Sequence, residues 1–144
     1  IEYNCRFGDP ETQVVLPLLE TDIMDIIEAV WEEKLDTLDI KWSDKSCACV
    51  VMASGGYPEK YETGKVISGL DENGQCEGAF VYHAGTKLED GKFLTAGGRV
   101  LGITAYGDTL KEALDTAYKA VDTISFEKAH YRHDIGKKAL SALK

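Results

Sequence analysis

The side chains best suited to chemistry lie in the first twelve residues of the chain. The alternation of residue types predicts that residues 1–8 form a strand that runs into a turn. On a strand, alternate side chains share a face, so Glu2, Asn4 and Arg6 would point the same way. Mg²⁺ prefers oxygen ligands, and a guanidinium holds phosphate or carboxylate through its planar fork. This face therefore predicts a site for Mg²⁺ and a phosphorylated ligand.

The turn leads into a predicted helix start that carries two carboxylates, Asp9 and Glu11, after Gly8. We expect Asp9 to be the N-cap and Pro10 to be the first helical residue. A helix N-terminus attracts anions, whereas two carboxylates at that point would repel a phosphate. The carboxylates are therefore expected either to cap the helix or to face a cation.

Two further residues are candidates for the site. His83 ends a predicted strand, a position that is more typical of a structural histidine than of a catalytic one. Gly97 and Gly98 lie between strands and indicate a tight turn or a bulge, after which Arg99 can reach a ligand cleft. Residues 131–134 are expected to pack the C-terminal part of the chain against the main body.

The elements that must position these residues change in type along the chain. Pro17 is expected to break the first helix, a second helix should run from about Thr21 to Leu35–Asp36, and residues 36–45 should connect it to a β-rich part. Thr109 and Glu112 form a capping-box pattern, which predicts the start of a third helix. A short helix should cover about Gly136 to Leu143. Five or six short antiparallel strands are predicted at residues 46–53, 65–70, 78–83, 86–88, 93–95 and 99–105, with hairpins at Asn73-Gly74 and Glu89–Gly91.

Composition narrows the function classes. Acidic residues outnumber basic ones by 25 to 16, and the net charge of −9 argues against nucleic acid as a partner. No apolar run is long enough for a membrane span. The four cysteines form no C-x-x-C pair, so we expect them to be reduced in a cytoplasmic protein.

The N-terminal pattern resembles the last metal-binding strand of the ATP-grasp enzymes. With Gly8-Asp-Pro-Glu11 after it, the segment is similar to that of the glycinamide ribonucleotide synthetases (phosphoribosylamine–glycine ligases). Four further segments resemble this family in the family's order, and the resemblance covers nearly the whole chain: Ala53–Pro58, His83–Thr86, Gly97–Leu101 and Tyr131–Gly136.

The resemblance implies that ATP, glycine and 5-phosphoribosylamine give ADP, phosphate and glycinamide ribonucleotide in purine biosynthesis, through a glycyl phosphate. It implies that Glu2 bridges Mg²⁺ (or Mn²⁺) ions and that Asn4 ligates one of them. Arg6 would be catalytic at the γ-phosphate or the acyl phosphate. Gly8, Asp9 and Glu11, together with Arg6, would bind substrate, and Asp9 or Glu11 would contact a substrate amine or ribose hydroxyl.

The resemblance also implies an α+β fold in two parts: residues 1–43 as the C-terminal end of the ATP-grasp catalytic domain, and residues 44–144 as the small antiparallel β-domain of the ligase with its packed helix. An ATP-grasp enzyme needs preceding lobes to hold the adenine and cover the phosphates. We therefore expect this chain to be the C-terminal part of a larger ligase and to be inactive without the N-terminal lobes of its parent.

Two alternatives remain open at this point. The Glu-x-Asn-x-Arg pattern also permits another ATP-grasp ligase or carboxylase, although residues 8–11 and 83–86 favour the glycine ligase. A non-catalytic binding module is the alternative from a different class.

Overall fold

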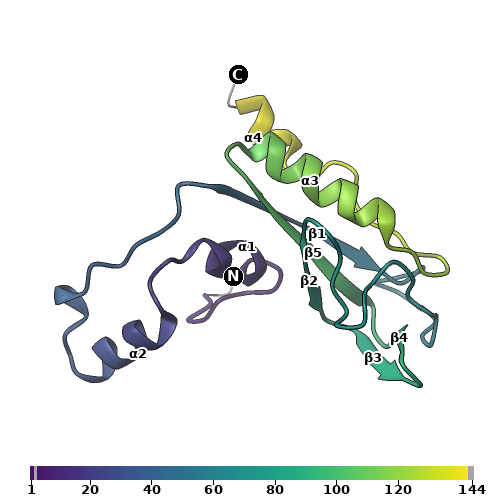
Figure 1. The fold of residues 1–144 in the computed structure, drawn as a ribbon, viewed down its shortest axis with the longest axis horizontal. Helices are drawn as coiled ribbons and strands as arrows, with labels where there is room; N and C mark the ends of the chain where they lie inside the picture. Colours follow the sequence, from purple (N-terminus) through teal and green to yellow (C-terminus); the bar gives the residue numbers. More distant parts are fainter. Residues whose placement is uncertain (2, 143–144) are drawn as a thin grey trace.

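A computed structural model describes residues 1 and 3–142 of the chain, and its centre is a three-stranded antiparallel sheet (Figure 1). The strand order is β1-β5-β2, so the long β5 lies in the middle and pairs with both neighbours. A separate two-stranded sheet is formed by β3 and β4. The strands are β1 (Ser46–Ala53), β2 (Phe80–His83), β3 (Thr86–Glu89), β4 (Lys92–Thr95) and β5 (Arg99–Gly107).

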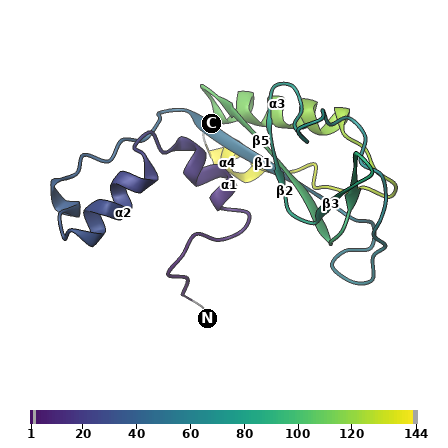
Figure 2. The ribbon, with the colours of Figure 1, turned by 60° about the horizontal axis from the view of Figure 1, so that its bottom comes forward.

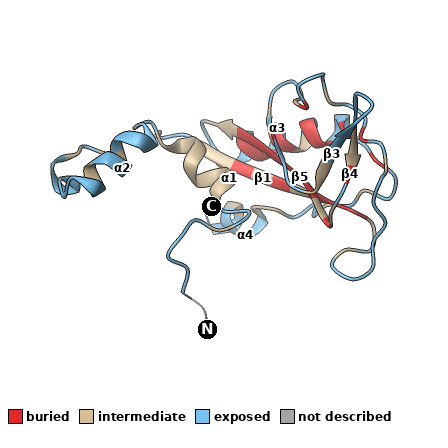
Figure 3. Cartoon of the chain, turned by 90° about the horizontal axis from the view of Figure 1, so that it is seen from below, coloured by how far each residue is buried: buried red, intermediate tan, exposed pale blue. Residues whose placement is uncertain are grey.

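One face of the sheet is covered by the helix α3 (Leu110–Thr123), and the core lies between them (Figures 1 and 3). The register places Val50 opposite Ile103 and Met52 opposite Leu101, and all four side chains are buried in this core. The helix begins where it was predicted, because the Thr109 hydroxyl accepts a hydrogen bond from the Glu112 amide at 3.2 Å. The predicted α+β fold with a packed helix is confirmed.

The predicted hairpin around Asn73-Gly74 is wrong, although a turn does form there. The Asp71 carboxylate accepts hydrogen bonds from the amides of Asn73 at 2.9 Å and Gln75 at 2.8 Å, which closes the turn. The strand expected at residues 65–70 forms only isolated bridges, and β2 pairs with β5 instead. The backbone hydrogen bonds of β2 are therefore made with β5 and not with residues 65–70. The second predicted hairpin is confirmed, with Asp90 and Gly91 at positive φ between β3 and β4.

The other face of the sheet carries the N-terminal part of the chain (Figures 1 and 2). The helix α1 (Thr12–Val15) contacts β1 and β5, and the 3₁₀ turn η1 (Leu16–Leu18) follows at Pro17, where the break was predicted. The Tyr106 hydroxyl donates to the Pro17 carbonyl at 3.2 Å. The sheet therefore separates the core under α3 from the segment that holds the candidate site residues.

Residues 20–42 leave the body as an excursion that carries α2 (Ile23–Trp31) and the turn η2 (Leu35–Thr37) (Figure 1). Its ends meet where Leu19 bridges Trp42 and the Ser43 amide donates to the Leu18 carbonyl at 2.8 Å. The predicted second helix exists, and its apolar side chains face solvent: Ile27 is 52 % exposed and Trp31 is 88 % exposed. This helix packs against none of the core described above (Figure 3).

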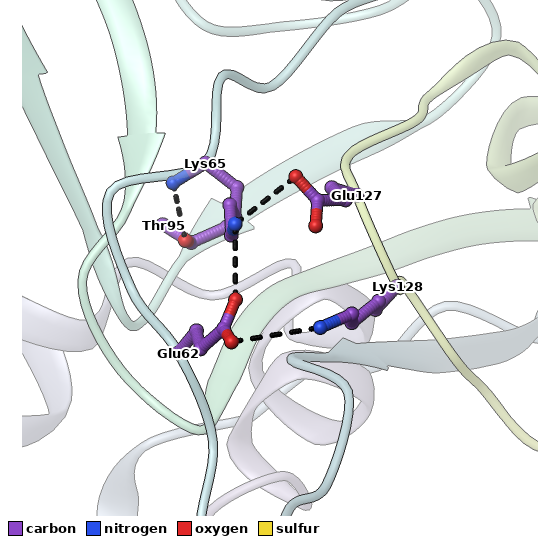
Figure 4. Close-up of polar contacts among 5 residues, drawn as sticks. All are labelled: Glu62, Lys65, Thr95, Glu127 and Lys128. Atoms are coloured by element: carbon purple, nitrogen blue, oxygen red, sulfur yellow. Dashed lines mark hydrogen bonds and ion pairs between the residues drawn. The ribbon is translucent and has the colours of Figure 1, made fainter.

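The loop between β1 and β2 is fastened to the chain after α3 by charged side chains (Figure 4). Lys65 Nζ lies 3.0 Å from a carboxylate oxygen of Glu62 and 3.0 Å from one of Glu127, while Lys128 Nζ lies 3.5 Å from Glu62. The Lys65 amide also donates to the Thr95 hydroxyl at 3.0 Å.

A short helix, α4 (Lys137–Ala142), follows near the predicted place. Among the described residues, no helix is long and apolar enough to cross a membrane.

Candidate active site

The segment that carries the predicted metal and phosphate ligands is an exposed stretch without strand pairing. The strand predicted for residues 1–8 is wrong for the described part of that range, which is irregular. A strand is stable only where its backbone N–H and C=O groups pair with a neighbour, and the described residues supply none here. Asn4 and Arg6 are exposed. Glu2 lies outside the described residues.

Arg6 borders an open cavity of about 620 Å³ between the N-terminal segment and β2. Its Nη1 donates to the carbonyl of its neighbour Phe7 at 3.0 Å, and it forms no ion pair with a carboxylate of the described residues. The guanidinium therefore keeps donors for an anion in this first cavity. The cavity wall also includes Gly8, Asp9, Gln13, Tyr82 and His83.

Asp9 joins the N-terminal segment to β5 and to α1. Its Oδ2 lies 2.9 Å from Nη2 of Arg99, and its backbone carbonyl accepts from Nη1 of the same guanidinium at 3.2 Å. Its Oδ1 accepts from Nε2 of Gln13 at 2.9 Å. The predicted helix cap is wrong, because these bonds engage the carboxylate and α1 begins only at Thr12, with Pro10 outside it.

Glu11 occupies the N-cap position of α1, but its side chain makes no capping hydrogen bond. The carboxylate instead lies against Gly8, where it would collide with a side chain on that residue. The amide of Thr12 donates to the Gly8 carbonyl at 3.0 Å, and the Thr12 hydroxyl donates to the same oxygen. Gly8, Asp9 and Glu11 are therefore gathered in one tight loop next to Arg6.

His83 ends β2, as predicted, and borders the first cavity. Its Nε2 lies 2.8 Å from the Gly74 carbonyl and its Nδ1 lies 2.9 Å from the Thr86 hydroxyl. A carbonyl only accepts, so Nε2 carries the proton and Nδ1 can accept from the hydroxyl. Both ring nitrogens have partners within the chain, which supports the structural role for this histidine.

The Gly97-Gly98 pair makes the close backbone approach from which Arg99 starts β5. The Ser54 hydroxyl donates to the Gly97 carbonyl at 2.8 Å, and the Ser54 amide donates to the Gly98 carbonyl at 2.8 Å. A side chain at Gly98 would collide with the ring of Tyr57. The register of β1 and β5 shifts at this point, as expected for a bulge, and Arg99 is aimed at Asp9.

Thiols and phenols of the sheet lie beneath this segment and stay uncharged at neutral pH. Burial raises the pKa of the Cys47 thiol to about 11, and the neighbouring Cys49 thiol adds to the rise. Burial also raises the pKa of Cys49, Tyr82 and Tyr106. The floor under α1 therefore adds no negative charge that would oppose an anionic ligand. All four cysteines of the chain are free.

The sequence interpretation missed Gln13 and Tyr82. Gln13 orients Asp9 and places its own Oε1 in a buried position without a partner among the described residues. The spacing of four between Asp9 and Gln13 was a usable signal, because residues four apart are neighbours on a helical turn. Tyr82 gave no signal, since only the pairing of β2 with β5 brings it to the first cavity.

Comparisons with known proteins give one consistent family. The model of the family "Phosphoribosylglycinamide synthetase, C domain" matches residues 47–138. A phosphoribosylamine–glycine ligase of Caldanaerobacter subterraneus is 55 % identical over 135 residues, which are 94 % of this chain and 32 % of that protein. The bifunctional purine biosynthetic protein purD of Dictyostelium discoideum is 50 % identical over 99 % of this chain and 18 % of its own length.

A solved structure agrees with these relatives. The crystal structure of a phosphoribosylamine–glycine ligase from Thermotoga maritima matches 93 % of this chain with a TM-score of 0.72 and 34 % sequence identity. The match covers 32 % of that chain. The present chain thus spans about a third of the length of the single-function relatives that it matches.

Proposed function

Because the chain belongs to the phosphoribosylglycinamide synthetase family, we propose that it is the C-terminal part of an ATP-dependent ligase. The ligase would join glycine to 5-phosphoribosylamine and give glycinamide ribonucleotide in de novo purine biosynthesis. The observation that carries the proposal is the family match over residues 47–138, the part of the chain that positions Arg99 and His83.

The reaction needs a carboxylate to be activated. A glycine carboxylate oxygen attacks the γ-phosphorus of ATP, ADP leaves, and a glycyl phosphate forms. The amine of phosphoribosylamine then attacks the acyl carbon, loses a proton and expels phosphate. No side chain has to form a covalent bond, so the protein contributes positioning and charge stabilisation. Arg6 is the residue of this chain that would hold the transferred phosphoryl group, because its donors face the first cavity.

Glu2 and Asn4 would hold Mg²⁺ (or Mn²⁺) with the ATP phosphates. A carboxylate and an amide oxygen fit the hard oxygen coordination that Mg²⁺ prefers. The exposure of Asn4 leaves room for waters and phosphates, which complete the coordination of a metal held by only one or two protein groups. When bound, the metal supplies Lewis acidity toward the phosphoryl group.

The loop of Gly8, Asp9 and Glu11 would bind the amino groups of the substrates. Each carboxylate oxygen can accept more than one hydrogen bond, so Asp9 keeps acceptor capacity beyond its bonds to Arg99 and Gln13. Glu11 is exposed next to it. Two carboxylates favour the protonated amine of glycine, whereas Arg6 favours the anionic groups on the same side.

Residues 1–43 would belong to the ATP-grasp catalytic domain, and residues 44–144 would form the C-terminal domain. The exposed apolar face of α2 supports this division, because Ile23, Ile27 and Trp31 bury little against the domain that follows. The N-terminal lobes of the parent ligase would be the intramolecular partner of this first segment. ATP, glycine and phosphoribosylamine would bind between them.

The test is an assay of the full-length protein with Mg-ATP, glycine and phosphoribosylamine. We expect ADP and glycinamide ribonucleotide in equal amounts by mass spectrometry. The Arg6→Ala variant should lose about 10²- to 10³-fold in kcat, as expected for a fixed charge that acts on the transition state. Glu2→Ala should lose most of kcat with an unchanged circular dichroism spectrum. Turnover with bicarbonate in place of glycine would instead favour a carboxylase of the same superfamily.

A further inference from the structure

A second cavity, of about 300 Å³, lies beside the first on the same face of the sheet. Its floor is formed by β1, through Cys49, Val51 and Ala53, and its walls include Pro10 and the segment 130–132. Pro10 follows Asp9, which borders the first cavity. The loop of Asp9 and Pro10 therefore separates two cavities that open on the same side of the sheet.

The distribution of arginine points to this second cavity. The chain contains only three arginines among its 16 basic residues, and all three line the two cavities. Arg6 borders the first cavity, whereas Arg99 and Arg132 border the second together with His130. Among the described residues, no acidic side chain lines the second cavity, although the chain has 25 acidic residues. The charged side chains that line this cavity are therefore basic, in a chain whose net charge is −9.

Each of the two arginines is held by a carboxylate that leaves part of its fork free. Arg99 uses Nη1 and Nη2 on Asp9, which leaves Nε without an acceptor among the described residues. Arg132 donates through Nε and Nη2 to Asp134, both at 2.9 Å, which leaves Nη1. Two-point pairing fixes the plane of a guanidinium, so its remaining donors are oriented before any ligand arrives.

We propose that the second cavity binds the phosphate ester of the sugar phosphate substrate, through Arg132, Arg99 and His130. This inference rests on the proposed function, which requires a ribose 5-phosphate group to be bound. The amine and the phosphate of phosphoribosylamine lie at opposite ends of the ribose. A substrate whose phosphate occupies the second cavity would therefore direct its amine toward the loop of Asp9, where the acyl phosphate forms.

The first test measures binding by isothermal titration calorimetry with the full-length ligase. Ribose 5-phosphate should bind, ribose should not, and inorganic phosphate should bind at least about tenfold more weakly than ribose 5-phosphate, because it lacks the sugar contacts. In Arg132→Gln the dissociation constant for ribose 5-phosphate should rise about tenfold or more, which is the loss of one charge-assisted hydrogen bond. Arg132→Lys keeps the charge but lacks the planar guanidinium, so its dissociation constant for ribose 5-phosphate should lie between those of the wild type and Arg132→Gln. Equal affinity for inorganic phosphate and ribose 5-phosphate would overturn the assignment to the ester.

The second test uses kinetics and a matched control. Arg132→Gln should raise the KM for phosphoribosylamine by a similar factor and change the KM values for ATP and glycine by less than about twofold. Lys119→Gln removes one positive charge from α3, on the opposite side of the sheet, and should leave all three values unchanged. An equal rise for all substrates, or no rise for phosphoribosylamine, would overturn the inference while the wild-type ligase remains active. A wild-type protein that forms no product would refute the proposed function instead.

Discussion

The guanidinium of Arg99 lies 2.9 Å from the carboxylate of Asp9, although the two residues are 90 positions apart in the chain. Nη1 of the same guanidinium donates a hydrogen bond to the Asp9 carbonyl, so two contacts join the two residues. The first residue of β5 therefore holds the loop that carries the proposed substrate ligands.

Replacing Arg99 should loosen this loop. In Arg99→Gln, amide hydrogen exchange should become faster at residues 8–13 and stay unchanged in α3, because only the loop loses its anchor. In the proposed ligase reaction of the full-length protein, the KM for glycine should rise about three- to tenfold, in line with one charge-assisted bond that is partly exposed. Arg99→Lys keeps the positive charge, so both the amide exchange and the KM should change less than in Arg99→Gln. Unchanged exchange at residues 8–13 would show that Asp9 is held by other contacts.

The buried thiols should make the chain less stable in alkali. In the folded chain the pKa of Cys47 is about 11, against an ordinary value of 9.0, so the folded state keeps a proton that the unfolded state releases. The free energy of unfolding should therefore keep this contribution below pH 9 and lose it as the pH rises toward 11. Cys47→Ser should flatten the pH dependence in urea titrations. A stability that rises over this range would contradict the assignment.

The same thiol should also react slowly with alkylating reagents. At pH 8 only a very small fraction of Cys47 is thiolate, so its labelling by iodoacetamide should accelerate about tenfold per pH unit up to about pH 10. Exposed Cys5 serves as the internal reference in the same mass spectrum. Fast labelling of Cys47 at pH 8 would show that the sheet face under α1 is open to solvent.

The core under α3 should depend on its largest buried side chains. Leu101 is 0 % exposed and packs between the sheet and α3, so Leu101→Ala should lower the free energy of unfolding by about 2–5 kcal/mol. Leu88→Ala removes the same atoms at a position that is 63 % exposed, and it should cost less than about 0.5 kcal/mol. Urea unfolding followed by circular dichroism measures both. Similar losses in the two variants would place Leu101 outside the core.

The charged contacts of Lys65 should restrain the loop between β1 and β2. In Lys65→Met both ion pairs are lost, and proteolytic cleavage within residues 55–66 should become about two- to fivefold faster. High salt screens exposed ion pairs, so 1 M NaCl should bring the wild-type rate close to that of the variant. A rate that is insensitive to salt would show that uncharged hydrogen bonds, such as those between residues 64–65 and Thr95, hold the loop.

The fold could be predicted where one local pattern decided the outcome. The β-type run of residues 46–53 and the capping box at Thr109 are strong local signals, and both elements were placed correctly. The strands at residues 65–70 and 1–8 were not, because strand formation depends on a partner that the local sequence does not name. Pairing of β2 with β5 left residues 65–70 with bridges only.

The site was less predictable than the fold for a similar reason. Arg6, Gly8 and Asp9 lie within four consecutive residues, so their grouping follows from the sequence. The contacts of Asp9 with Arg99, and the gathering of Arg132 beside them, depend on how β5 and the segment after α3 return to the same face. Helix capping was the local expectation for Asp9, and a long-range ion pair replaced it.

The helices α3 and α1 lie on opposite faces of the three-stranded sheet (Figures 1 and 2), and residues of the segment before α1 line both cavities. Lys119 is exposed on α3 and lines neither of the two cavities. A fluorescent reporter or a surface linker attached at Lys119 would leave the side of the two cavities open. The full-length protein could then be immobilised and observed one molecule at a time while both cavities stay accessible.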